Sequence, residues 1–170
     1  MKFVGVLLAA TLSAGCGYHV SGKADLVPRN IKTIAVPAFG NVTTRYKLAE
    51  QLPAAITREF LERTRYNVVA DPNRADAILN GSVVNFMSYP TVFDPVSGRA
   101  TGVQAIVILN ISLTERATGR PIYNRPGMEI RERYEISVDP KAYFDESGAA
   151  MLRLSRDVAR TVVSAVLENF

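Results

Sequence analysis

The sequence predicts an α+β fold, in which a mixed, largely antiparallel β-sheet of about four to five strands carries two long helices packed on one face. Two segments, residues 44–64 and the segment ending at Leu167, have apolar residues at helical spacing. The region between them alternates apolar and polar residues, as strands do. The chain has 170 residues, of which 48% are hydrophobic, so it can bury the core of one such domain.

The first part of the predicted domain is a strand, a helix and a strand. Residues 31–36 are rich in β-branched side chains and stop at Pro37, which suits a short buried strand. The amphipathic helix follows over residues 44–64, and Pro53 within it predicts a kink or a late start because proline cannot donate a backbone hydrogen bond. Residues 66–70 form the next strand, so we expect these two strands to be parallel.

A run of antiparallel strands is predicted next. Residues 77–93 form a long strand, with Gly81 and Pro90 as expected bulge or bend points. Residues 103–113 alternate most clearly, and residues 122–137 return after a turn. The outer face of that last strand alternates in charge, which indicates cross-strand pairing on a solvated edge.

The final helix is predicted to begin near Asp145 or Ser147, either of which can cap it, and to run to Leu167. One broad apolar row is expected to be buried: Met151, Leu152, Leu154, Val158, Ala159, Val162, Val163 and Val166. A basic row is expected to face outward: Arg153, Arg156 and Arg160. The chain contains no internal repeat and no second domain.

The N-terminal segment, residues 1–15, has one lysine followed by an apolar run that is too short to span a membrane, so it is predicted to be a cleaved export signal. It leads into Leu-Ser-Ala-Gly-Cys, which resembles the bacterial lipoprotein processing box. That resemblance implies that Cys16 is lipidated and anchors the protein, and that Gly17 directs it to the outer membrane. Residues 16–30 are then a lipidated tether, and residues 31–170 form the domain.

Several function classes are excluded by composition and motifs. One cysteine and one histidine leave no disulfide framework and no zinc site, and the modest net charge of +4 is interleaved, so a nucleic-acid partner is not expected. The sequence has no phosphate-binding loop and no nucleophile elbow, so neither an enzyme nor a cofactor is expected. An enzyme acting on envelope glycans would need a cleft with paired carboxylates. The acidic residues around the last helix start are explained by turn formation and the helix dipole.

Several segments together resemble the LptE family of lipopolysaccharide-assembly lipoproteins. They are residues 16–22 (CGYHVSG), 31–37 (IKTIAVP), 46–62, 75–81 (ADAILNG) and the Thr118-Gly119 turn. The resemblance implies a non-catalytic domain that plugs the lumen of the β-barrel LptD, assists its assembly and helps to deliver lipopolysaccharide to the outer leaflet. It also implies a location at the outer membrane, facing the periplasm and the barrel lumen.

The resemblance places lipid contacts at the tip of the long hairpin and in the loop before the last helix. The positive side chains there are Arg99 and Lys141, and solvated loop charges are the alternative interpretation. Phe93, beside the hairpin turn, is either a barrel contact or part of the core. An alternative function is a lipoprotein binding module that activates a peptidoglycan synthase. The short tether counts against that function.

Overall fold

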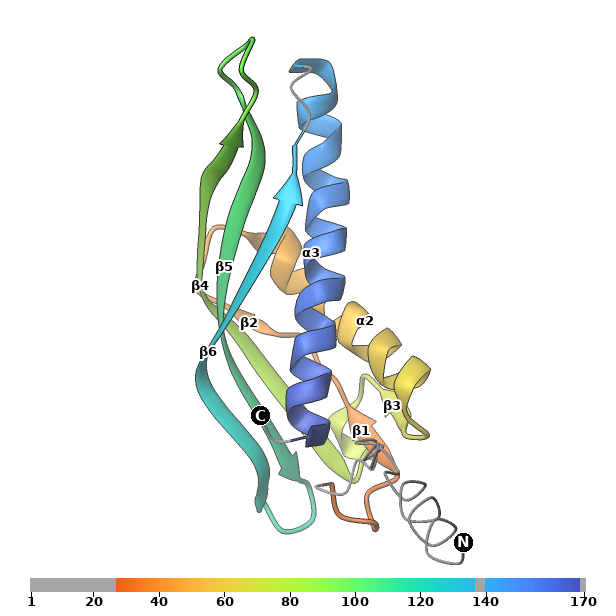
Figure 1. The fold of residues 1–170 in the computed structure, drawn as a ribbon. Helices are drawn as coiled ribbons and strands as arrows, with labels where there is room; N and C mark the ends of the chain where they lie inside the picture. Colours follow the sequence, from red (N-terminus) through yellow and green to blue (C-terminus); the bar gives the residue numbers. More distant parts are fainter. Residues whose placement is uncertain (1–26, 137–139, 169–170) are drawn as a thin grey trace, which may run out of the picture.

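The computed structural model describes residues 27–136 and 140–168, without the side chains of residues 140–147. The elements, in chain order, are β1 (Thr33–Ala35), β2 (Gly40–Asn41), α2 (Tyr46–Arg63), β3 (Asn67–Val69), the 3-10 turn η1 (Pro72–Arg74), β4 (Ala77–Phe93), β5 (Ala100–Glu115), β6 (Pro121–Glu135) and α3 (Pro140–Glu168). The predicted α+β architecture is confirmed (Figure 1). The sheet of the described residues has six strands, slightly more than predicted.

The sheet has the order β3-β1-β4-β5-β6. The short β2 also pairs with β4, along the side of that strand that faces away from β5. β1 runs parallel to both β3 and β4, so the predicted parallel pair on either side of the first helix is confirmed. β4, β5 and β6 form an antiparallel meander, with β6 at the edge. The two-residue β2 was not predicted, because so short a strand leaves no period in the sequence.

The core lies between the inner face of β5 and the two helices. Alternate residues of β5 are at most 8% exposed: Val103, Ala105, Val107, Leu109, Ile111 and Leu113. The side chains that complete the core come from both helices and include Leu48, Leu52, Ile56, Phe60, Leu154, Val158 and Val162. Among the described residues, neither helix combines the length and apolar character that crossing a membrane requires.

Helix α3 differs from prediction at two points. It begins at Pro140, not near Asp145 or Ser147, which is possible because proline is well tolerated in the first turn of a helix. The prediction that Leu152 is buried is wrong, since its side chain is 51% exposed. Leu152 precedes Arg156 by four residues, so both lie on the outward face, whose arginines are exposed as predicted.

The structure tests the three positions where proline or glycine was expected to interrupt an element. Helix α2 begins at Tyr46, well before Pro53, so the late start is wrong and the alternative, a kink at Pro53, stays a prediction. Gly81 is not a bulge, because its register with β5 is regular, and the alternative of a bend there stays a prediction. Instead the ring of Phe39 packs against it so closely that a Cβ atom on Gly81 would lie 2.2 Å from the ring. The predicted irregularity at Pro90 is confirmed by a register shift directly after it.

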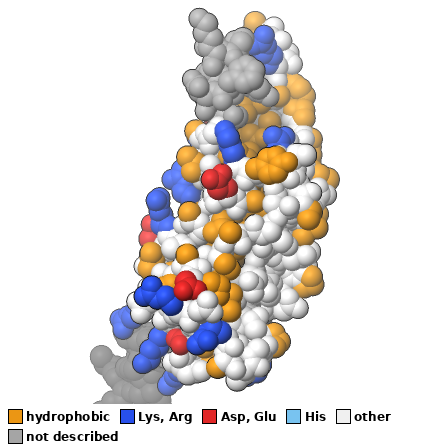
Figure 2. Space-filling view, turned by 180° about the vertical axis from the view of Figure 1, so that it is seen from behind, with side chains coloured by type: hydrophobic (Ala, Val, Ile, Leu, Met, Phe, Trp, Pro, Cys, Tyr) orange, Lys and Arg blue, Asp and Glu red, His pale blue; other side chains and the backbone are white. Residues whose placement is uncertain are grey.

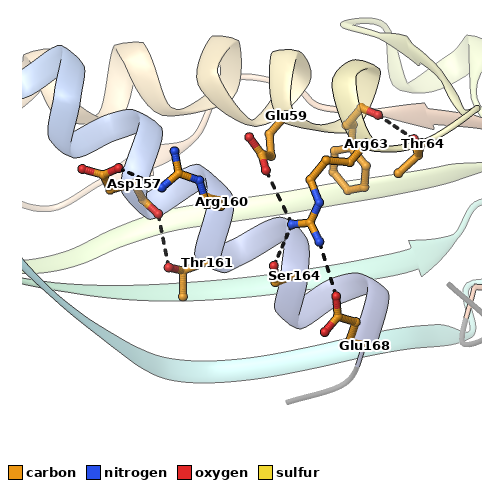
Figure 3. A network of polar contacts seen from close by, with 9 residues as sticks. Glu59, Arg63, Thr64, Asp157, Arg160, Thr161, Ser164 and Glu168 are labelled. Carbon is orange, nitrogen blue, oxygen red and sulfur yellow. Dashed lines mark hydrogen bonds and ion pairs between the residues drawn. The ribbon is translucent and has the colours of Figure 1, made fainter. Parts of the chain in front are cut away.

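The C-terminal ends of α2 and α3 are joined by Arg63 (Figure 3). Its guanidinium donates to the hydroxyl of Ser164 at 2.7 Å and forms ion pairs with Glu59 at 3.5 Å and Glu168 at 3.3 Å. A cation in the last turn of α2 also complements the helix dipole. This network links the two helices at the end away from the hairpin tip.

One acidic side chain of β6 lies on the inner, helix-facing side of the sheet. Glu132 pairs with the buried Ala105. Burial raises the pKa of its carboxyl, nearby Asp157 raises it further, and Arg160 opposes them. A carboxyl with a raised pKa in the folded state costs stability when it ionises, and this cost is absent at pH values below its unfolded pKa.

We predict that Gly81→Ala lowers the free energy of unfolding by about 1–3 kcal/mol, because the new methyl group overpacks against Phe39. Denaturant unfolding followed by circular dichroism measures this change. Adding Phe39→Leu should restore part of the loss. The control Gly148→Ala, where a Cβ meets nothing within 4 Å in helix α3, should stabilise the protein. An unchanged midpoint for Gly81→Ala would contradict the prediction.

We predict that Glu132→Gln raises the free energy of unfolding at pH 7, because glutamine removes a partly buried charge. Below the unfolded pKa of about 4.3, the Glu132 carboxyl is protonated in both the folded and the unfolded protein. The gain in unfolding free energy should therefore vanish as the pH falls through that value. Unfolding measured across this pH range tests the prediction. Glu135→Gln, on the exposed face of the same strand, is the matched control. Equal gains for the two variants, or a gain that persists at low pH, would disprove it.

Candidate functional site

The β4–β5 hairpin tip holds two of the residues singled out in the sequence. Arg99 lies in the turn, and Phe93 pairs with Ala100 at the last register position of the hairpin. Asp94 closes the turn, because its carboxylate accepts hydrogen bonds from the amide and hydroxyl of Ser97, both at 2.6 Å. These bonds hold the pKa of the Asp94 carboxyl below its ordinary value. The structure therefore brings Arg99 and Phe93 together on a closed tip.

Lys141 lies in the first turn of α3, not in a loop before it, which corrects the sequence-based prediction. Its side chain lies outside the described residues, as does Cys16 with the whole signal and most of the tether. Figure 1 shows that the beginning of α3 and the hairpin tip are at the same end of the molecule. Arg99 and the backbone of Lys141 thus share one end of the domain.

Exposed apolar side chains follow the outer half of β4 into its turn. We call them the β4 strip: Val84, Met87, Tyr89, Val92, Phe93 and Val96, each between 38% and 94% exposed. Phe93 is 56% exposed, so it belongs to this surface and not to the core. Figure 2 shows hydrophobic side chains along this edge of the molecule, whereas acidic and basic side chains gather on the opposite side of that view. Apolar side chains gathered in this way are typical of contact surfaces.

A bulge in β4 turns the middle of the strip outward. The register with β5 shifts between Val83 and Asn85, which moves the following side chains to the opposite faces of the sheet. Beyond the bulge, Met87 and Tyr89 therefore point away from the helices. Beyond Val83, no strand of the described chain pairs with the free side of β4. We missed the strip in the sequence, although two adjacent apolar residues, Val83 and Val84, signal such a change of phase.

The outer face of the second half of β6 alternates in charge, as predicted. Its exposed side chains are Glu129, Arg131, Arg133 and Glu135. Arg131 and Glu129 form an ion pair, and Arg133 donates to the side chain of Gln104 on β5 at 3.3 Å. The outer surface of the sheet thus combines an apolar edge at β4 with a charged edge at β6.

A cavity of about 570 Å³ lies between the start of α2, the inner face of the upper hairpin and α3. We call it the α2–hairpin cavity. Arg45 and Lys47 line it beside apolar side chains of the sheet and of both helices. The sequence analysis missed this site, because its lining comes from five elements, α2, β4, β5, β6 and α3, and no local pattern in the sequence shows that they lie close together.

Comparison with known proteins adds three findings. The model of the LptE family, described as lipopolysaccharide-assembly, matches residues 31–166. A proposed lipoprotein from Caulobacter crescentus superposes with a TM-score of 0.51 at 15% identity, over 80% of this chain and 86% of that chain. A PelC dodecamer subunit from Paraburkholderia phytofirmans gives 0.50 at 14% identity, over 80% and 87%. At these identities the two structures show a shared fold alone. No curated protein matches the sequence.

Proposed function

Because this chain belongs to the LptE family of lipopolysaccharide-assembly proteins, we propose that it sits in the lumen of an LptD-like β-barrel, assists the assembly of that barrel and helps to deliver lipopolysaccharide to the outer leaflet. The family is one of non-enzymatic lipoproteins. The role proposed for this chain is accordingly one of binding and not of catalysis.

The proposed anchor is Cys16. It is the single cysteine of the chain and follows the Leu-Ser-Ala-Gly segment of the processing box. Several acyl chains on one residue hold a protein stably at a membrane, whereas one chain gives only marginal attachment. The residue after it, Gly17, supports an outer-membrane location for the anchored protein.

The observation that carries the barrel partnership is the β4 strip. An apolar strip along an unpaired strand is a surface that a partner covers, because large apolar side chains gain stability when they leave water. The charged outer face of β6 suits the polar interior of a large barrel. In the proposed complex the strip, with Phe93 at its end, contacts the barrel wall or an inward loop, while the charged face lies toward lumen water.

Arg99 and Lys141 are proposed to bind the phosphates of lipopolysaccharide. A guanidinium can pair with phosphate in a bidentate geometry, and an ammonium adds a point charge. Both residues belong to the same end of the domain as the β4 strip, so a lipid held there would lie near the barrel contact.

We predict that Val92→Asp combined with Phe93→Asp abolishes co-purification of a β-barrel, because it places charges on the apolar contact. The native lipidated protein, extracted from membranes in mild detergent, should bring the barrel in about equal amount. The control Val42→Asp with Leu61→Asp, at exposed apolar positions outside the strip, should retain the barrel. Recovery of a peptidoglycan synthase in place of a barrel would refute the proposed partnership, and full recovery by the strip variant would refute the proposed surface.

We predict that Arg99→Glu with Lys141→Glu weakens lipopolysaccharide binding about tenfold or more, because repulsion replaces two charge-assisted contacts. Binding by the purified protein and display of lipopolysaccharide on the cell surface should both fall. Arg58→Glu with Arg65→Glu makes the same charge change on exposed positions at the far end of α2 and should leave both intact. Normal binding by the tip variant would disprove its role.

A further inference from the structure

The α2–hairpin cavity opens to solvent and has apolar side chains at its base. Leu48 and Ala150 are fully buried beneath it, and Val103 is 8% exposed. Pro90 and Met151 also line it. Its volume of about 570 Å³ is in the range of small-molecule sites, which are concave, mostly apolar and supplied with a few polar groups.

Positive charge gathers at the mouth of this cavity without an acidic partner among the described residues. Arg45 precedes α2 as its N-cap residue and makes no capping bond, and the first turn of the helix contains no acidic residue. The Arg45 guanidinium instead lies 5.1 Å from the centroid of the Phe86 ring, which holds it beside the hairpin. Lys47 is exposed, and no described residue forms a hydrogen bond or ion pair with it.

This arrangement opposes the usual pattern of helix beginnings. The N-terminal end of a helix carries a partial positive charge and is normally accompanied by acidic residues. Here Arg45 and Lys47 lie beside it. Two side-chain cations and the positive end of the helix dipole therefore lie together at the edge of a cavity with an apolar floor. Neither cation forms an ion pair with a described residue. A ligand with a negative group attached to an apolar chain satisfies both the rim and the floor.

We infer that the α2–hairpin cavity receives one fatty acyl chain of lipopolysaccharide, with a phosphate of the same lipid bound between Arg45 and Lys47. The identity of the lipid rests on the function proposed above, while the acyl and phosphate chemistry follows from the lining of the cavity. The lining reaches Ala100, next to Arg99, so this site adjoins the hairpin tip, but neither Arg99 nor Phe93 lines it. The lipid would be held by its chain inside the domain and by its phosphate at the start of α2.

The test is equilibrium binding of purified lipopolysaccharide to the mature chain, residues 16–170, with Cys16→Ser so that no attached acyl chain competes. Arg45→Glu with Lys47→Glu should weaken binding about tenfold or more, and Arg58→Glu with Arg65→Glu should not. Ser88→Trp, which fills the cavity from β4, should also weaken binding, whereas Thr161→Trp, at an exposed position of α3 outside the cavity, should leave it unchanged. Unfolding midpoints equal to that of the parent chain confirm that each variant is folded.

Two lipid probes test the acyl contact and the phosphate contact separately, and a third tests the identity of the lipid. Deacylated lipopolysaccharide should bind weakly and be insensitive to Ser88→Trp, whereas dephosphorylated lipid A should be insensitive to the Arg45 and Lys47 changes. Phosphatidylglycerol vesicles test the other source of the same chemistry, and preference for them over lipopolysaccharide would overturn the assigned ligand. Binding unaffected by both the charge and the filling variants would overturn the site.

The outcome is separable from that of the barrel partnership. If the cavity variants lose lipid but the native lipidated chain still co-purifies with a barrel, both proposals stand. If no barrel is recovered while the cavity binds lipopolysaccharide, only the plug role fails. If the barrel is recovered while the cavity variants bind lipid as the parent does, only this inference fails.

Discussion

The inner face of β5 packs against both long helices, and the placement of the other elements follows from this contact. Successive side chains of a strand point to opposite faces, so the clear alternation of β5 commits one whole face to burial. Its inner side chains from Val103 to Leu113 are nearly inaccessible. Each large apolar side chain buried in this way contributes about 1.5–3 kcal/mol, far more than a surface ion pair. β4 and β6 extend this face on either side, and the helices cover it.

A mismatch of lengths then creates the open features of the molecule. β4, with 17 residues, extends over about 55 Å, whereas the 18 residues of α2 span only about 27 Å. The 29 residues of α3 reach about 43 Å, so α3 alone accompanies the hairpin beyond the start of α2. The α2–hairpin cavity lies where the cover by α2 ends. The β4 strip begins close to the point where β2 stops pairing with β4.

These features gather at one end of the domain, and the described chain begins at the other (Figure 1). The N-terminal end is closed by polar contacts: Glu115 accepts hydrogen bonds from Asn30 at 2.9 Å and Thr118 at 2.6 Å, which lower the pKa of its carboxyl. An anchored protein of this shape would present its hairpin away from the point of attachment. In the proposed role, one end of the domain holds the tether while the other contacts barrel and lipid.

Local patterns were sufficient for the fold class, both helices, the parallel pair, the long meander and the family, because each depends on periodicity or on motifs within a short segment. Cys16 and Arg99 could be singled out in the same way. Tertiary structure decided the rest. Gly81 was predicted as a bulge or bend point, but its register is regular and it makes room for the distant ring of Phe39. Leu152 looked buried, but the sheet lies on the other side of its helix. The bulge after Val83 reverses which side chains of β4 meet solvent, and the cavity lined by Arg45 arises only where five elements meet. The adjacent Val83 and Val84 mark the bulge locally, but the other features depend on contacts between remote residues, which no period in the sequence encodes.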